Sequence, residues 1–211
     1  MVGAVNSPVK AAAVVLAAGR STRMGARNKL LLEIEPGVAV VRRVVERARA
    51  SVAGPVYVVT GHQAEKVREA LAGLDCIFVH NPDFADGLSG SVRAGFGAAV
   101  DAGADGVIAF LGDMPFVPEA AITAVREAAS ANPGRMVQAV TGGRPAHPVW
   151  LPARLSALVD RLEGDHGIRG MIAGSGEEMI TVEVGGQAAV DLDTPQDYAA
   201  ALAAGKPAHG D

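Results

Sequence analysis

Short apolar runs alternate with helical patterns along most of the chain, and this alternation limits the possible folds more than any other feature. The runs are near-continuously apolar, as strands covered by helices on both faces of a sheet are. They lie at residues 11–17, 55–61, 76–80, 106–112, 136–140 and 179–184. Because strands that alternate with helices form βαβ units, we predict an α/β fold: a three-layer sandwich with a mostly parallel, Rossmann-like sheet.

The segments between the expected strands have the periodicity of amphipathic helices. In the clearest of them, Val41, Val44, Val45 and Ala48 recur at helical spacing while arginines and Glu46 take the other face. Further helices are expected at residues 64–72, 89–101, 118–130 and 195–204. These helices would cover the two faces of the sheet.

The length of 211 residues fits one domain with a core of ordinary size. We expect a single domain over residues 1–211, ordered over about 11–204, with flexible tails at 1–10 and 204–211.

The charge balance argues against polyanions as partners. A net charge of −4 and a pI near 5.7 give no general attraction to nucleic acid or to an anionic membrane. The apolar run at residues 11–19 is too short to cross a bilayer. Cys76 is the single cysteine, so it has no internal disulfide partner and is expected to be a core thiol. These features are typical of a cytoplasmic protein.

The loop after the first expected strand combines glycines with basic side chains. These residues are Gly19, Arg20, Arg23, Gly25, Arg27 and Lys29. Glycines let backbone N–H groups approach phosphate oxygens, and Arg and Lys neutralise the charge of a polyphosphate. A plain strand-to-helix turn with solvated basic residues is the simpler alternative. The segment matches neither GxxxxGK[ST] nor GxGxxG, so neither a P-loop nor a dinucleotide-binding motif is supported.

Two distant stretches offer carboxylates for a divalent metal. Asp113 follows the expected strand 106–112, and Asp191 and Asp193 lie in the segment Val190 to Tyr198. Mg²⁺ prefers such hard oxygen ligands and usually takes one or two of them together with phosphates and water. Each stretch also has a structural interpretation, because Gly-Asp-x-Pro forms turns and Asp193 or Thr194 could cap a helix.

Serines at an expected helix start follow the third strand. Ser89 and Ser91 would present hydroxyl and N–H groups near the same sheet edge. Ser89 is also a simple helix cap, which is a common role of serine. His62, after Gly61, is expected to be a loop residue.

The motif Leu-Ala-Ala-Gly-x-Ser-x-Arg-Met-Gly from Leu16 to Gly25, followed by Lys29, resembles the signature of the MobA-like nucleotidyltransferases. The resemblance implies the glycosyltransferase-A-like nucleotidyltransferase fold, with Lys29, Arg23 and Asp113 as catalytic residues. The nucleotide-binding residues that it implies are Leu16, Ala17, Ala18, Gly19, Arg20, Ser21, Arg23, Met24, Gly25, Lys29, Gly61, Ser89, Ser91 and Asp113. Within the family, LAAG is similar to the cytidylyltransferases, which implies CTP, with Ala18 giving the base more room.

The same resemblance extends to the metal and to the acceptor. It implies Mg²⁺ held by Asp113, Asp191 and Asp193, with Asp191 ranked ahead of Asp193 as the second ligand. It also implies acceptor contacts from His147, Asp165 and Arg169, although Ala146 stands where the family has glycine. His147 could instead sit neutral against a strand that ends at Trp150. The implied acceptor is a phosphorylated small molecule, molybdopterin, and a molybdoenzyme or its chaperone would be a transient partner.

These observations predict a nucleotidyltransferase that moves CMP from CTP to its acceptor and releases pyrophosphate. One alternative is transfer to a sugar phosphate or a similar acceptor with CTP or GTP. Another is an oxidoreductase, which the missing GxGxxG motif and the low aromatic content oppose. A nucleotide-binding protein without turnover is the third.

Overall fold

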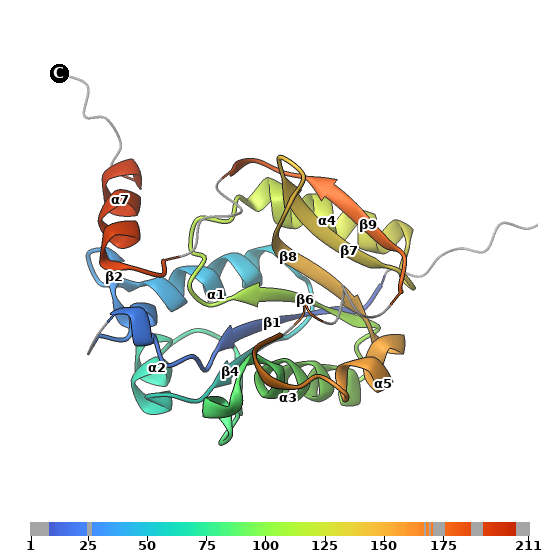
Figure 1. The fold of residues 1–211 in the computed structure, drawn as a ribbon, viewed down its shortest axis with the longest axis horizontal. Helices are drawn as coiled ribbons and strands as arrows, with labels where there is room; N and C mark the ends of the chain where they lie inside the picture. Colours follow the sequence, from blue (N-terminus) through green and yellow to red (C-terminus); the bar gives the residue numbers. More distant parts are fainter. Residues whose placement is uncertain are drawn as a thin grey trace, which may run out of the picture.

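A seven-stranded sheet forms the centre of the protein in the computed structural model, which describes residues 9–24, 27–166, 168, 170, 176–186 and 192–205 (Figure 1). Its strands are β1 (Ala11–Ala17), β4 (Val56–Thr60), β5 (Ile77–His80), β6 (Gly106–Leu111), β7 (Met136–Thr141), β8 (Arg144–Pro152) and β9 (Met179–Glu183). The longer helices are α1 (Val40–Ser51), α2 (Ala64–Ala70), α3 (Leu88–Asp101), α4 (Glu119–Ala131) and α7 (Pro195–Gly205). The predicted mostly parallel α/β sandwich is confirmed.

The strand order is β5-β4-β1-β6-β8-β7-β9. β1 pairs in parallel with β4 on one side and with β6 on the other, and β4 pairs in parallel with β5. The chain therefore leaves β1 in one direction along the sheet and returns to its other side for β6. In open α/β sheets a crevice forms at the carboxyl ends of the strands where the order reverses, which here means β1 and β6.

The residues of β1 alternate between two apolar cores. Ala13 and Val15 pack with α1 and α4, whereas Val14 and Leu16 pack with α3 on the opposite face (Figure 1). Successive residues of the strand point to opposite faces of the sheet. Because helices cover both faces, residues on either face are shielded from water, and the strand is apolar throughout. This is the three-layer arrangement that the apolar runs predict.

Strand β8 was missing from the predicted strands, and only its end near Trp150 was anticipated. It runs antiparallel to both neighbours, β6 and β7, in the middle of the sheet. Its sequence RPAHPVWLP contains three prolines and begins with polar residues, a composition that argues against a central strand. The pairing tolerates these prolines beside an irregularity between Gln138 and Val140 of β7.

A small hairpin and the last helix form one corner of the molecule. Strands β2 (Glu33–Glu35) and β3 (Val38–Ala39) make a two-stranded sheet that the sequence did not predict. Beside it, Val40 and Leu192 are fully buried. The Tyr198 hydroxyl of α7 donates a hydrogen bond to the Glu33 carbonyl oxygen. The corner thereby anchors the segment that carries Asp193.

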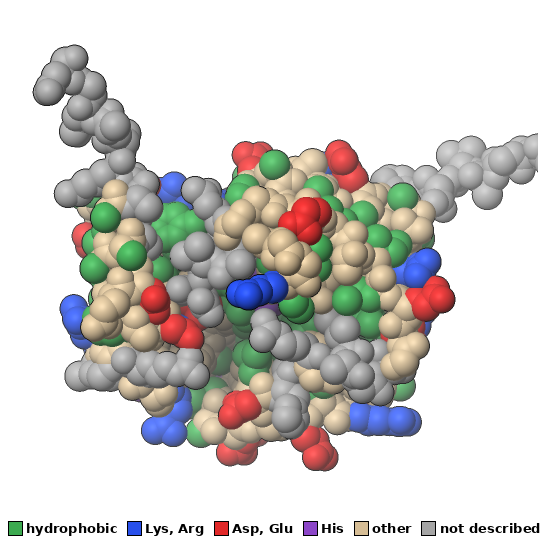
Figure 2. Space-filling model, turned by 45° about the horizontal axis from the view of Figure 1, so that its top comes forward, with side chains coloured by type: hydrophobic (Ala, Val, Ile, Leu, Met, Phe, Trp, Pro, Cys, Tyr) green, Lys and Arg blue, Asp and Glu red, His purple; other side chains and the backbone are tan. Residues whose placement is uncertain are grey.

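One face of the molecule shows acidic and basic side chains spread singly among the residues drawn in colour (Figure 2). Among the described residues, no helix has the length and apolar character needed to cross a bilayer.

Candidate active site

A cavity of about 550 Å³ opens at the carboxyl ends of β1 and β6. Its wall combines backbone and side chains of the loop after β1 with residues from four other parts of the chain. It is lined by Leu16, Ala18, Gly19, Arg20, Ser21, Thr22, Lys29, Leu30, Phe84, Ala85, Gly87, Leu88, Ser91, Leu111, Asp113, Asp165 and Asp193. The cavity thus lies at the edge where the topology favours a ligand.

Lys29 lies between two carboxylates in the lining of this cavity. Its Nζ atom is 2.5 Å from Asp113 Oδ2 and 2.7 Å from Asp193 Oδ1. The side chains of Lys29 and Asp113 are each 15% exposed, so water screens their interaction only partly. Three residues separated by as many as 164 positions therefore meet at one point. The predicted convergence of Lys29, Asp113 and the last acidic stretch is confirmed.

The backbone around Asp113 explains how this carboxylate reaches the cavity. Gly112 donates its N–H to the Leu16 carbonyl at 2.9 Å, which ties the end of β6 to β1. A Cβ atom on Gly112 would lie 2.8 Å from the same carbonyl oxygen, so this close approach requires glycine. Leu192 donates its N–H to the Asp113 carbonyl at 3.2 Å, which brings the last acidic stretch alongside.

Asp193 is fixed by the start of α7. Thr194 Oγ1 accepts the N–H of Asp197 at 3.2 Å, and the Asp197 carboxylate accepts both the N–H and the hydroxyl of Thr194. This reciprocal pair is a capping box with Pro195 at the first helical position. The helix-start interpretation of the stretch is therefore correct, and it coexists with the contact between Asp193 and Lys29.

The environment of Lys29 raises the pKa of its ammonium above the ordinary value. Burial alone acts in the opposite direction and lowers the pKa, but the charges of Asp113 and Asp193 and their hydrogen bonds outweigh it. Lys29 is consequently a fixed cation at neutral pH. A fixed cation can hold phosphate oxygens, but it cannot act as a general base.

Part of the cavity lining is apolar. Phe84, Ala85 and Leu88 belong to this part, and Leu88 is 36% exposed despite its size. Ser91 also lines the cavity and accepts a hydrogen bond from Asn81 Nδ2 at 3.0 Å. The cavity lining therefore combines the charged groups around Lys29, suited to phosphates, with apolar residues and a hydroxyl, suited to a flat heterocycle.

Ala18, which is expected to give a base more room, lines the cavity and packs beside Gly61 and Phe84. A Cβ atom added to Gly61 would lie 2.9 Å from the methyl carbon of Ala18 and 2.5 Å from Phe84 Cβ. Ala18, Gly61 and Phe84 are thus tightly packed, and a methyl group there fills space that glycine would leave. The effect of Ala18 on the choice of base stays a prediction.

The other predicted site residues are only partly gathered at the cavity. Of the expected nucleotide-binding residues, the cavity lining includes Leu16, Ala18, Gly19, Arg20, Ser21, Lys29, Ser91 and Asp113. Ala17, Met24, Gly61 and Ser89 are not among the residues that line it. Ala17, Met24 and Ser89 are buried in the structure, and their contacts with a nucleotide stay a prediction. Gly25 and the side chain of Arg23 lie outside the described part of the chain.

The acceptor-side prediction divides in the same way. Asp165 lines the cavity, near the place where α3 begins against Gly164. His147 lies on β8 and is not among the lining residues. Arg169, like the favoured metal ligand Asp191, falls outside the described residues.

The sequence motifs do not include two apolar residues of the cavity lining, Phe84 and Leu88, because both lie outside the motifs, in the stretch after β5. They also do not include Asn28 and Gln63, which lie behind the lining. Asn28 does have the sequence signal of a helix cap, directly before Lys-Leu-Leu.

A divalent cation fits the carboxylate pair. Two carboxylates that both reach one nitrogen atom can also reach one small cation, and oxygen ligands suit Mg²⁺. Within the described residues there is no group of three or more His, Cys, Asp or Glu side chains placed to hold a metal. The described part therefore supplies Asp113 and Asp193 as a pair, which leaves room for ligands from phosphate and water.

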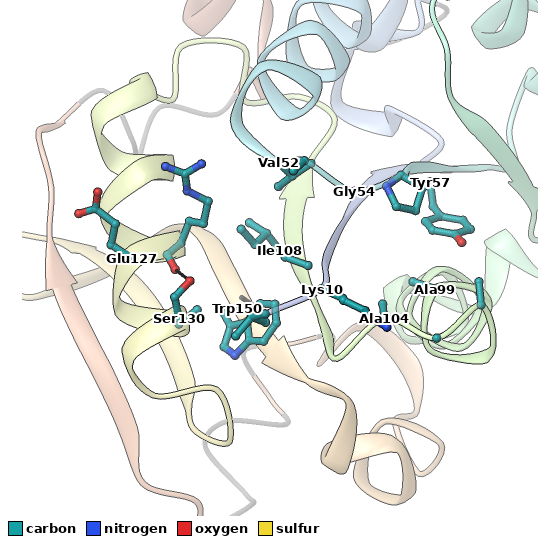
Figure 3. Close-up of a pocket in the computed structure, with 18 residues that line it drawn as sticks. Lys10, Val52, Gly54, Tyr57, Ala99, Ala104, Ile108, Glu127, Ser130 and Trp150 are labelled. Atoms are coloured by element: carbon teal, nitrogen blue, oxygen red, sulfur yellow. Dashed lines mark hydrogen bonds between the residues drawn. The ribbon is translucent and has the colours of Figure 1, made fainter. Parts of the chain in front are cut away.

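A larger cavity, of about 750 Å³, lies at the opposite edge of the sheet (Figure 3). The close-up shows Ile108 and Trp150 between α4, which carries Glu127 and Ser130, and the region of Tyr57 and Ala99. Its walls are mostly small apolar residues at the amino ends of the strands. Because the described residues that line it include neither a pair of carboxylates nor a phosphate-binding loop, we assign the chemistry to the smaller cavity.

Comparisons with known proteins agree with this geometry. The family model described as MobA-like NTP transferase domain matches residues 13–180. The chain is 33% identical over 121 residues to the bifunctional protein GlmU of Nitratidesulfovibrio vulgaris. The matched region covers 57% of this chain and 26% of that protein. The chain thus spans about a quarter of the length of the curated relatives that it matches.

Solved structures resemble the chain over nearly its whole length. Rv0371c of Mycobacterium tuberculosis H37Rv is 27% identical with a TM-score of 0.78, covering 93% of this chain and 99% of that one. The same protein has been solved in complex with manganese. A nucleotidyl transferase from Methanothermobacter thermautotroptrophicus is 26% identical with a TM-score of 0.80. The superposition covers 92% of this chain and 97% of that one.

Proposed function

The chain belongs to the family of MobA-like NTP transferase domains, and on that premise we propose that it transfers CMP from CTP to a phosphorylated small molecule. The acceptor that we propose is molybdopterin, and the second product is pyrophosphate. The contact of Lys29 with both Asp113 and Asp193, inside a cavity at the carboxyl ends of β1 and β6, carries the proposal.

The triphosphate binds beside the charged groups around Lys29. Arg20 and Lys29 contact its β- and γ-phosphates, and the backbone N–H groups around Gly19 approach the same oxygens. Cytosine lies toward Phe84 and Leu88, where Ser91 offers a hydroxyl. Arg23, as the family resemblance implies, adds a further positive charge.

The acceptor's phosphate oxygen attacks the α-phosphorus of CTP. A new P–O bond forms, the bond from the α-phosphorus to the bridging oxygen breaks, and pyrophosphate leaves with the electron pair. A phosphate monoester is already largely ionised at neutral pH, so the step requires no strong general base. Lys29 and Arg20 neutralise the charge that accumulates on the leaving group, and catalysis rests on positioning and electrostatics.

Asp113 and Asp193 would hold Mg²⁺, with Asp191 as a further ligand. When bound, the ion screens the negative charges of nucleotide and acceptor and polarises the phosphoryl oxygens. The manganese complex of Rv0371c supports a divalent cation in proteins of this fold. Asp165 is proposed to face the acceptor, together with Arg169 and His147, and we place the reaction in the cytoplasm.

Pyrophosphate release tests this function directly. Each of the four common nucleoside triphosphates is incubated with Mg²⁺ and the protein, first with molybdopterin and then with sugar 1-phosphates. We expect release with CTP and molybdopterin, and a rise in melting temperature with CTP in the absence of acceptor, because a ligand of the native state stabilises it.

Release with GTP or with a sugar phosphate alone would replace the proposed substrates and keep the reaction class. Binding of a nucleotide without release under any acceptor would overturn transfer and favour a nucleotide-binding protein. NAD(P)H oxidation would instead favour the oxidoreductase alternative.

A further inference from the structure

Asn28 connects the loop after β1, which contributes to the cavity lining, to the loop before α2. The residue is 6% exposed, and its Oδ1 atom accepts the N–H of Leu30 at 3.1 Å and the hydroxyl of Ser21 at 3.3 Å. Its Nδ2 atom donates to Gln63 Oε1 at 3.5 Å. One buried amide thus joins the loop after β1 to the loop before α2.

The hydroxyl of Ser21 completes this junction. It accepts the N–H of Lys29 at 3.2 Å while donating to Asn28. The hydroxyl of Ser21 is therefore engaged on both sides within the protein. Lys29 is the first residue of the short helix η2 (Lys29–Leu31), for which Asn28 is the N-cap.

The backbone on both sides of the junction adopts a conformation that is rare for residues other than glycine. Ser21 has a φ of +53° and Gln63 a φ of +52°, and among the described residues these are the only non-glycine residues with positive φ. Such conformations are held in place by surrounding contacts and cluster at functional sites. Here both residues are hydrogen-bonded to the same side chain, although they lie far apart in the sequence.

We propose that Asn28 is a positioning residue that fixes the direction in which Lys29 leaves the loop. By capping η2 and holding Ser21 and Gln63 in left-handed conformations, it aims Nζ of Lys29 at the point where Asp113 and Asp193 meet. Asn28 does not line the cavity, so it acts through Lys29. The kinetic part of this inference rests on the proposed function, whereas the structural part does not.

Amide hydrogen exchange measured by NMR tests the structural part without any substrate. In Asn28→Ala the N–H groups of Lys29 and Leu30 should exchange at least about tenfold faster. Leu30 loses its acceptor, and the Ser21 hydroxyl that accepts from Lys29 loses the Asn28 oxygen that orients it. Val14, in the centre of β1, should exchange as in the wild type. Asn28→Asp keeps both acceptor contacts and should restore the protection of Leu30 to within about threefold.

A matched control separates this role from general stability. Asn132 donates from Nδ2 to the Ala128 carbonyl at the end of α4, at 3.1 Å and far from the cavity. Asn132→Ala therefore removes a comparable side-chain hydrogen bond at a helix end. It should leave the exchange of Lys29 and Leu30 unchanged.

Steady-state kinetics of pyrophosphate release test the positioning of Lys29. Asn28→Ala should lower kcat at least about tenfold and change the KM for CTP less than about threefold, because a misaimed Lys29 mainly fails in the transition state. Asn28→Asp should recover most of kcat, and Asn132→Ala should match the wild type. Where Asn28→Ala does not fold, Gln63→Gly replaces it, because glycine adopts the positive φ without strain while the contact to Asn28 is lost.

Unchanged exchange of Lys29 and Leu30 in Asn28→Ala would overturn the junction. If Asn132→Ala lowered kcat as much as Asn28→Ala does, the positioning role of Asn28 would be overturned. A wild-type protein that shows the expected exchange pattern but releases no pyrophosphate with any acceptor would refute the proposed function and still support the junction.

Discussion

The two edges of the central sheet each contain a cavity, and the cavities differ in their lining. At the amino ends of the strands the cavity has about 750 Å³ and mostly apolar walls, whereas at the carboxyl ends it has about 550 Å³ and contains the Lys29 contacts. The lining of the larger cavity is mostly apolar, and its few charged residues do not meet at one point as those around Lys29 do. Charged groups brought together from distant segments, more than volume, therefore mark the edge at which chemistry is expected.

Strand β6 displays the same contrast on its own. Asp105 precedes it at the amino edge, is exposed, and accepts the N–H of Lys10 at 2.9 Å. Asp113 follows it at the carboxyl edge, is 15% exposed and contacts Lys29. Asp105 and Asp113 thus form a matched pair of aspartates, and substituting each of them tests how much the two edges of the sheet contribute to turnover.

The largest expected effect is that of Asp113→Ala. It removes a carboxylate from both the metal pair and Lys29, so turnover should fall by about a thousandfold or more. The fold should survive, because Asp113 lies at the cavity and outside the apolar core. Pyrophosphate release measures turnover, and circular dichroism during heating measures stability.

Asp105→Ala is the control for this change and should keep turnover within about twofold of the wild type. If both variants lost activity equally, the difference between the edges would have no functional meaning. Full activity in Asp113→Ala would remove the metal assignment altogether.

Lys29→Met should have the next largest effect, a loss of roughly a hundredfold in turnover, because the leaving pyrophosphate loses a fixed cation. Its second consequence distinguishes it from a simple loss of fold. Without nucleotide, Asp113 and Asp193 no longer contact an ammonium, so the variant should bind Mn²⁺ more tightly than the wild type does. Isothermal titration with Mn²⁺ alone measures this gain.

Lys10→Met is the matched change, because Lys10 lines the larger cavity at the other edge. It should alter neither turnover nor Mn²⁺ affinity by more than about twofold. Weaker Mn²⁺ binding in Lys29→Met than in the wild type would show that the ammonium does not compete with the ion.

Much of the fold could be predicted because both faces of most strands are buried. Such strands are apolar without interruption, and β1 and β6 follow this rule from end to end. Strand β8 breaks it, since prolines and a polar start hide a strand that enters the sheet antiparallel. Its place depends on long-range pairing with β6 and β7, which local composition does not encode.

The candidate site divides along similar lines. Lys29 and Asp113 could be predicted because each follows a strand that ends at the same edge, and parallel topology then brings them together. Asn28 and Gln63 could not, since their importance arises from hydrogen bonds between loops and from backbone conformations that no motif indicates. Ala17, Met24 and Ser89 lie within the motifs and are buried.

Adding volume to each cavity sharpens the comparison at a smaller scale. Ala85 and Ala102 are exposed alanines that line the carboxyl-edge and amino-edge cavities. Ala85→Leu should raise the KM for the nucleotide roughly fivefold, about 1 kcal/mol of binding free energy. Ala102→Leu should change it less than twofold, roughly the noise of such a measurement. A larger effect from Ala102→Leu would indicate that the amino edge communicates with the site.

The contacts of Lys29 with Asp113 and Asp193 should also make the free energy of unfolding fall at alkaline pH. The folded pKa of Lys29 lies above its ordinary value of 10.5, as the effect of Asp113 and Asp193 exceeds that of burial. The stabilisation is therefore complete below the unfolded pKa and is lost as the pH rises through the folded pKa. The difference in melting temperature between the wild type and Lys29→Met should therefore shrink by a few degrees between about pH 10 and pH 12. A constant difference over that range would contradict the contribution of Lys29.

The smallest expected effect concerns the thiol of Cys76, which directly precedes β5 at the amino edge. Burial, with a smaller contribution from Asp75, raises the pKa of this thiol, against the opposing effect of Arg49. A raised pKa leaves less thiolate at a given pH, so iodoacetamide should react more slowly with Cys76 than with free cysteine at pH 8. Once alkylated, the protein should retain turnover within about twofold, because the modified group is at the opposite edge from Lys29. A large loss of turnover in protein that remains folded would mean that the amino edge takes part in the reaction after all.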